Sequence, residues 1–286
     1  MKELNLKIWK RGSQRAPHKP LLLLYALGKW KSGQREFPWL EINERVGGLI
    51  DEFGGNAKPD ASNPFVRLRN DLNGKLWQIE GELVLGASDN PIISSLKKNN
   101  NIARFHSDFE KYIRNENAID NIVNQLLVEH FSETQFEDIL DACGLSGSES
   151  ATVYLKRSKR NPEFRQAVLD AYGHKCAICD YDIQFRTKII GVEAAHIQWH
   201  NSEGPDVINN GVALCAIHHK LLDYGAIAFN DGYELISATG LKGAKAQLDY
   251  LIYDHEYKQI TLPRNGMSEP SIEYLRWQRK EIFKGQ

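Results

Sequence analysis

The sequence lacks any long apolar run, and none of its hydrophobic stretches approaches the roughly 20 residues needed to cross a bilayer. It opens with MKELNLK, which is charged where a signal peptide would need an apolar segment. Internal repeats and low-complexity tracts are also missing. These absences argue against membrane, secreted and fibrous proteins and predict a cytoplasmic one. A chain of 286 residues, 42% hydrophobic and 26% charged, is typical of a globular protein with two domains.

Cysteine is scarce, with four residues in the whole chain. Cys143 stands apart, whereas Cys176, Cys179 and Cys215 lie close together in the second half. In a reducing cytosol, closely spaced cysteines indicate metal or redox chemistry rather than disulfides.

The net charge is also small, at −1, but it hides a strong asymmetry. Residues 1–75 contain 14 Lys and Arg against 8 Asp and Glu, a net charge of +6. Residues 76–150 contain 5 against 13, a net charge of −8. The basic first quarter favours either contact with nucleic acid or a solvated basic face without a partner.

Apolar patterning predicts a mainly helical first half. Residues 20–30 (PLLLLYALGKW) are apolar on nearly every side, which is typical of a buried helix. Residues 76–85 alternate around Gly81 and predict a small hairpin. Residues 146–160 pass from small polar residues to a basic run without apolar period, as in a linker. We therefore predict a first domain over 1–145 and a second over 161–286.

Two short spacings in the second domain predict a metal site. Cys176 and Cys179 are separated by two residues, and so are Cys215 and His218. Each spacing lets a tight turn direct two ligands toward one ion, and four thiolate or imidazole ligands suit tetrahedral structural Zn²⁺. A redox pair is less consistent with the sequence, because no βαβ pattern surrounds it.

A second cluster consists of His196, Asn210 and His219. His196 lies near the end of an alternating run, 189–197, which predicts a strand. Asn210 lies in a turn, and residues 212–223 predict a short helix that carries His218 and His219. A strand, a loop and a helix can thus bring a histidine, an asparagine and a histidine to one point.

With these residues in view, the segment 161–235 resembles the HNH endonucleases. Asn210 follows His196 by 14 residues, and His219 follows Asn210 by 9, as in zinc-supported HNH domains. The resemblance implies an α+β protein whose second domain has the ββα-metal fold. It implies that His196 is the general base and that His219 holds a single Mg²⁺ or Mn²⁺. Asn210 would fix the loop of His196 or complete the ion site.

The position before the proposed base departs from many HNH sites, which place an acid or a histidine there as a metal ligand. Here it is Ala195. Glu193 lies two residues earlier on the same strand face, so it is a candidate for the missing carboxylate ligand; alternatively it is a surface residue.

The first domain resembles the sulfur-binding domain of phosphorothioation-dependent restriction endonucleases. The segments that carry this resemblance are RAPHKPLLLLY (15–25), NPFVRLRND (63–71) and the closing stretch 126–145. It implies binding of double-stranded DNA in which sulfur replaces a non-bridging phosphate oxygen. Where relatives have a tyrosine before the proline, this chain has Asn63.

Sulfur is less well hydrated than oxygen, so a reader of phosphorothioate needs an apolar wall with cations beside it. The resemblance assigns the wall to one proline and the polar and cationic contacts to its neighbours: Pro64, with Arg15, His18, Lys19, Asn63 and Arg67. The same residues can be read as ordinary helix starts and solvated charges.

Two other functions remain open at this stage. One is an HNH nuclease that reads a methylated base, for which Trp30, Trp39 and Trp77 could form an aromatic cage. The other is a zinc-bearing DNA-binding protein whose nuclease has decayed, as Ala195 would allow. Cutting both strands requires two active sites most simply, so a homodimer is expected, and the helix expected at 270–283 either forms its interface or caps its own domain.

Overall fold

The computed structural model of the protein describes residues 4–8, 15–146, 161–264 and 268–285. The chain divides into two compact units, Met1–Arg157 and Ser158–Gln286. Apart from Ser146, the linker expected at 146–160 lies outside the described residues. Within the described ranges, no helix is both long and apolar enough to span a bilayer.

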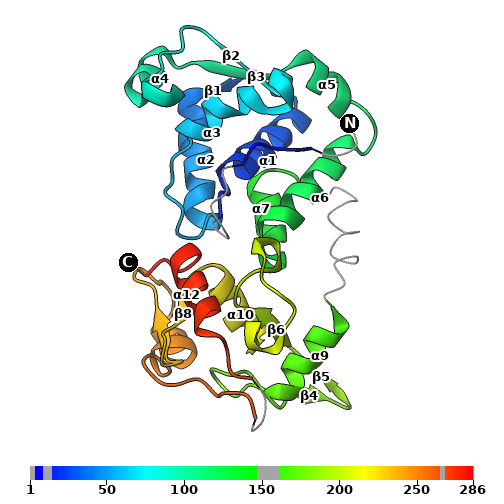
Figure 1. Cartoon of the computed structure of the whole chain (residues 1–286), viewed down its shortest axis with the longest axis vertical. Helices are drawn as coiled ribbons and strands as arrows, with labels where there is room; N and C mark the ends of the chain where they lie inside the picture. Colours follow the sequence, from blue (N-terminus) through cyan, green and yellow to red (C-terminus); the bar gives the residue numbers. More distant parts are fainter. Residues whose placement is uncertain (1–3, 9–14, 147–160, 265–267, 286) are drawn as a thin grey trace. The chain divides into compact units, whose positions relative to one another are not determined.

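The first unit is built around α1 (His18–Lys31), which confirms the buried helix predicted at 20–30. This helix lies between α2 (Trp39–Phe53) and α3 (Ser62–Arg67) on one side and α6 (Ala118–His130) on the other (Figure 1). It is apolar all round because it is covered all round, and Leu21 to Leu24 are 0% exposed. Further elements are η1 (Leu68–Gly74), η2 (Ala87–Asp89), α4 (Ile93–Asn99), α5 (Ser107–Ile113), η3 (Glu133–Gln135) and α7 (Phe136–Ala142).

The hairpin predicted at 76–85 is wrong. Strand β2 (Trp77–Glu80) ends before Gly81, whose φ is +88°, and pairs with β3 (Ile102–Phe105) instead. β3 also pairs with β1 (Phe37–Pro38), so it is the central strand of an antiparallel sheet. The residues after Gly81 are mostly exposed, whereas β3 buries Ala103 and Phe105. β2 therefore pairs with β3, which offers apolar side chains to the core, and not with the exposed segment that follows Gly81.

The second unit contains the strand pair and helix that an HNH fold needs. β6 (Val192–His196) runs antiparallel to β7 (Gly211–Cys215), with His196 opposite Gly211. The helix predicted over 212–223 is wrong in its first four residues, because α10 spans only Ala216–Asp223. All five residues of β7 are buried, as in a strand covered on both faces.

The remaining elements of the second unit surround this pair. α9 (Pro162–Ala171) packs on β6 and β7, with Asn161 as its cap accepting from the backbone N–H of Glu163. The other elements are β4 (Gln184–Phe185), β5 (Lys188–Ile189), η4 (His200–Ser202), η5 (Ile208–Asn210), β8 (Ile227–Phe229), β9 (Leu235–Ser237), α11 (Lys245–Leu248), η6 (Asp249–Tyr253) and α12 (Ile272–Glu281).

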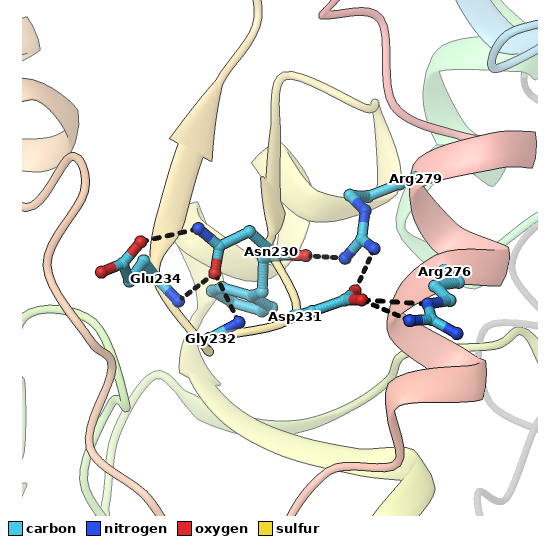
Figure 2. Close-up of polar contacts among 7 residues, drawn as sticks. Asn230, Asp231, Gly232, Glu234, Arg276 and Arg279 are labelled. Carbon is cyan, nitrogen blue, oxygen red and sulfur yellow. Dashed lines mark hydrogen bonds and ion pairs between the residues drawn. The ribbon is translucent and has the colours of Figure 1, made fainter.

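Helix α12, expected over 270–283, packs on its own unit and buries Leu275, Trp277 and Gln278. Figure 2 shows how its exposed side is attached: the carboxylate of Asp231, in the turn between β8 and β9, pairs with Arg276 and Arg279. The helix therefore caps its own unit. A homodimer stays a prediction.

Candidate functional site

The four residues predicted as Zn²⁺ ligands gather at one point. The ligand atoms of Cys176, Cys179, Cys215 and His218 all lie within 4.8 Å of one another. Nδ1 of His218 lies 3.4, 3.5 and 3.2 Å from the three sulfurs in that order. Its other nitrogen, Nε2, faces the carbonyl oxygen of Leu251 at 2.7 Å, which orients Nδ1 into the cluster.

The chemistry of this Cys3His cluster fits a divalent cation. Hydrogen bonds from Cys179 and Cys215 hold the pKa of Cys176 well below its usual range, while contact with that sulfur raises the pKa of Cys179. Burial lowers the pKa of His218, but the cysteine sulfurs outweigh it and raise the pKa to about 10. A thiolate at Cys176 thus disfavours a second one at Cys179, so ligation through both sulfurs needs a positive charge such as that of Zn²⁺.

His196 is held on two sides. Its Nε2 lies 2.8 Å from Oδ1 of Asp206, and its ring stacks on Phe164 with 4.1 Å between centroids. Burial alone would raise the pKa of Asp206, but hydrogen bonds from His196 and Asn161 outweigh burial and hold the pKa below its ordinary value. An ionised carboxylate accepts a proton from Nε2, and in that tautomer Nδ1 is the basic nitrogen of the ring.

Asn210 is fully buried, and its side chain forms hydrogen bonds with the loop that follows His196. Its Oδ1 accepts from the backbone N–H of Gln198 at 2.8 Å. Its Nδ2 donates to the carbonyl oxygens of Gln198 and Pro205, both at 2.9 Å. Of the two roles considered for Asn210, this geometry favours fixing the loop.

His219 lies between two carboxylates. Its Nδ1 is 2.7 Å from Oε2 of Glu193, and its Nε2 is 3.3 Å from Oδ2 of Asp223. The strand β6 thus brings the candidate carboxylate to the candidate metal-binding imidazole. A carboxylate oxygen suits Mg²⁺ or Mn²⁺, and an imidazole nitrogen beside it is a better ligand for Mn²⁺ than for Mg²⁺. The residues present fit such an ion.

Sequence reasoning missed the supporting carboxylates Asp206 and Asp223. Asp206 lies in the loop before Asn210, where no periodic signal exists. Asp223 could have been found, because it follows His219 by four residues on a predicted helix, and such residues are neighbours on one face. Trp199, whose Nε1 donates to Oδ1 of Asp223 at 2.9 Å, was also not singled out.

The first unit has a cavity of about 530 Å³ beside the start of α1. Five of the six residues predicted to contact DNA border it: His18, Lys19, Asn63, Pro64 and Arg67. Its wall also includes residues that sequence reasoning did not single out as contacts, namely Lys7, Ile8, Ala16, Lys58, Asp60 and Asn70. The cavity therefore combines apolar walls with several cations.

Three cations of this region already have partners within the first unit. Lys19 lies 2.5 Å from the fully buried carboxylate of Asp71. Arg15 does not border the cavity, because its Nη2 donates to the carbonyl oxygen of His130 at 2.9 Å. Arg67 does border it, and its guanidinium donates to Oδ1 of Asn63 and Oδ1 of Asn90 at 3.1 and 3.0 Å. Asn63 thus aligns Arg67 along the cavity edge.

Comparison with known families identifies both units. The family model "HNH endonuclease" matches residues 176–230, so the second unit is an HNH endonuclease domain. The family model "ScoMcrA-like, DNA sulfur-binding domain" matches residues 2–148, which is about half of the chain. The chain belongs to the family with a ScoMcrA-like DNA sulfur-binding domain, here followed by an HNH endonuclease domain.

The solved structures that the chain resembles are distant. The "Sulfur binding domain of ScoMcrA complexed with phosphorothioated DNA" is 23% identical, with a TM-score of 0.41 over 49% of this chain and 91% of that one. The "Type IV phosphorothioation-dependent restriction endonuclease ScoMcrA" is 24% identical, with a TM-score of 0.39 over 45% of this chain and 28% of that one. The "Modification dependent TagI restriction endonuclease" is 19% identical, with a TM-score of 0.34 over 43% and 38%. A comparison with curated proteins gives no match.

Proposed function

We propose that the protein is a modification-dependent restriction endonuclease that binds phosphorothioated double-stranded DNA and hydrolyses phosphodiester bonds nearby. The observation that carries this proposal is the cavity beside α1, bordered by Pro64 and by cations, in a chain that also has an HNH domain. Sequence reasoning placed the same residues in the same role from their resemblance to sulfur-binding domains.

Sulfur recognition follows from the composition of the cavity. Pro64, Ile8 and Ala16 offer apolar surface, which a poorly hydrated sulfur contacts at lower cost than a hydrated oxygen does. Lys7, Lys58 and Arg67 offer positive charge for the rest of the phosphate. Asp71 neutralises Lys19, so Lys19 orders the wall and contributes little net charge.

Hydrolysis is assigned to the residues around β6, β7 and α10. Asp206 holds the Nε2 proton of His196, so Nδ1 takes the proton of the attacking water. Asn210 keeps the loop 198–205 in place through three hydrogen bonds. His219 and Glu193 would hold the divalent ion. When bound, that ion neutralises the charge that develops on the phosphate and stabilises the departing oxygen.

The structure gives little support to a reader of methylated bases. Trp39 and Trp77 are 0% and 1% exposed, and Trp30 is 9% exposed. Trp77 stacks on Phe37 in the core of the first unit. An aromatic cage for a flipped base needs ring faces that the base can reach, and these three indoles are covered.

Cleavage of matched duplexes tests the proposal. One duplex carries phosphorothioate linkages, a second is unmodified, and a third carries 5-methylcytosine in the same sequence. With Zn²⁺-loaded protein and Mn²⁺ or Mg²⁺, we expect cleavage of the first duplex only. Equal cleavage of the first two duplexes, or cleavage of the methylated duplex alone, would refute sulfur recognition. Absence of cleavage with every divalent ion would refute the nuclease assignment.

Two variants separate binding from hydrolysis. His196→Ala removes the base and should abolish cleavage while phosphorothioate-specific binding remains, as measured by fluorescence anisotropy. Pro64→Asp places an anion in the cavity wall and should abolish specific binding. Asp60→Asn is a matched control at the same cavity, because it removes an existing anion and should not weaken binding.

A further inference from the structure

Asp223 is a buried carboxylate to which neither the sequence motifs nor the mechanism above assigns a role. It is the last residue of α10, and its side chain is 1% exposed. Its Oδ1 accepts the indole N–H of Trp199 at 2.9 Å, and its Oδ2 lies 3.3 Å from Nε2 of His219. A buried carboxyl group is costly unless its oxygens have partners, and these two contacts give one to each oxygen.

The two carboxylates beside His219 differ in exposure. The side chain of Glu193 is 35% exposed, whereas that of Asp223 is 1% exposed. A bulky substrate such as a DNA phosphate can approach only the exposed side. The ion would therefore bind on the Nδ1 side, next to Glu193, and Asp223 would face the nitrogen that points into the protein.

This placement sets the tautomer that ion binding needs. A neutral imidazole carries one proton, and the nitrogen that binds an ion has to be the other one. A carboxylate acceptor at Nε2 keeps the proton there and leaves the lone pair on Nδ1. Carboxylates that orient metal-binding histidines in this way are a general feature of metal sites.

Helix α12 completes the surroundings of Asp223. Trp199, which is 4% exposed, forms a small buried cluster with Trp277 and Ile282. The rings of Trp199 and Trp277 lie 6.4 Å apart between centroids. The indole that donates to Asp223 is thus packed against the C-terminal helix, which keeps water away from the carboxylate.

We propose that Asp223, held by Trp199, is a positioning residue that fixes His219 with Nδ1 toward Glu193 and the divalent ion. This inference rests on the proposed function, because it concerns the ion of the same nuclease site. It adds Trp199 and the packing face of α12 to the structure on which ion binding depends.

The test is Asp223→Asn in the full Zn²⁺-loaded chain. Asparagine has a single acceptor oxygen, so it cannot serve the N–H groups of Trp199 and His219 with two separate oxygens. We expect Mn²⁺ affinity, measured without DNA by electron paramagnetic resonance, to fall by about 10- to 100-fold. The Mn²⁺ concentration for half-maximal cleavage should rise by a similar factor, and saturating Mn²⁺ should restore most of the rate.

Two further variants separate positioning from folding. Trp199→Phe keeps a ring against Trp277 but removes the indole N–H, so it should weaken Mn²⁺ binding in the same direction by a smaller factor. Asp231→Asn removes the ion pairs of α12 on its exposed side (Figure 2) and should leave Mn²⁺ affinity unchanged. If Asp223→Asn loses bound Zn²⁺ or shows no melting transition, that variant is misfolded. The Mn²⁺ affinity of Trp199→Phe then tests the positioning role.

The outcomes distinguish this inference from the proposed function. Wild-type protein that neither binds Mn²⁺ nor cleaves DNA would overturn both. Wild-type protein that binds and cleaves, with folded Asp223→Asn and Trp199→Phe variants of unchanged Mn²⁺ affinity, would overturn only the positioning role. Glu193→Gln should also weaken Mn²⁺ binding, and a loss with Asp223→Asn alone would place the ion at Nε2 instead.

Discussion

Replacing Asn210 with alanine should loosen the loop that follows His196 without changing the ion site. The change removes three hydrogen bonds, one from the N–H of Gln198 and two to carbonyl oxygens of Gln198 and Pro205, of which the last is only partly buried. At about 1 kcal/mol for each lost bond, the second unit should lose about 3 kcal/mol of unfolding free energy. For a unit of its size this corresponds to a fall in Tm of roughly 10 °C.

The assay follows thermal unfolding of the Zn²⁺-loaded chain together with Mn²⁺ affinity and cleavage rate. If Asn210 only fixes the loop, Tm and cleavage fall while Mn²⁺ affinity is retained. Asn209→Ala is the matched control, because the half-buried neighbour bonds Ser271 through its backbone carbonyl. An unchanged Tm with a tenfold loss of Mn²⁺ affinity would refute the reasoning and make Asn210 an ion ligand.

Three further changes test other parts of the structure. Asp206→Asn removes the anion that favours the protonated form of His196, so the acidic limb of the cleavage–pH profile should move to lower pH. The maximal cleavage rate should fall by about 10²-fold or more. An unchanged pH profile would contradict this expectation. Cys176→Ser should abolish stoichiometric Zn²⁺ in elemental analysis and unfold the second unit; an active, folded variant would exclude the Zn²⁺ site. Gly28→Ala would place a Cβ 1.8 Å from the carbonyl oxygen of Cys143 and should lower Tm of the first unit by several degrees, as measured by calorimetry.

The sign of the Asp206 prediction follows from its pKa. Since hydrogen bonds hold that pKa below its ordinary value, the carboxylate is already ionised where cleavage begins to rise with pH. Its contribution to stability is present at neutral pH and is lost only as the pH falls through its lowered pKa. Loss of cleavage in mild acid would therefore report protonation of His196, not of Asp206.

Local signals predicted the buried helix of the first unit and the Cys3His cluster. The apolar run at 20–30 can only be stable when it is covered on all sides, and α1 is so covered. The spacings around Cys176 and Cys215 are local, so they predict a metal site independently of how the rest of the chain folds. By contrast, β2 pairs with a strand more than twenty residues away, and no alternation near Gly81 reveals that partner. The first four residues of 212–223 were misread because an apolar run fits a buried strand as well as a helix.

The ligands of a metal site can be predicted from their spacing in the sequence, whereas the residues that orient them have no fixed spacing. Zn²⁺ imposes a spacing on Cys176 and Cys179, because a short turn has to present both sulfurs to one ion. A carboxylate that orients an imidazole needs only to reach its far nitrogen, and any loop or helix that passes there can supply it. Asp206 comes from a loop and Asp223 from a helix, and they serve His196 and His219 in the same way. Such residues are therefore found in a structure, by identifying what contacts the ring nitrogen that neither binds the ion nor takes the proton.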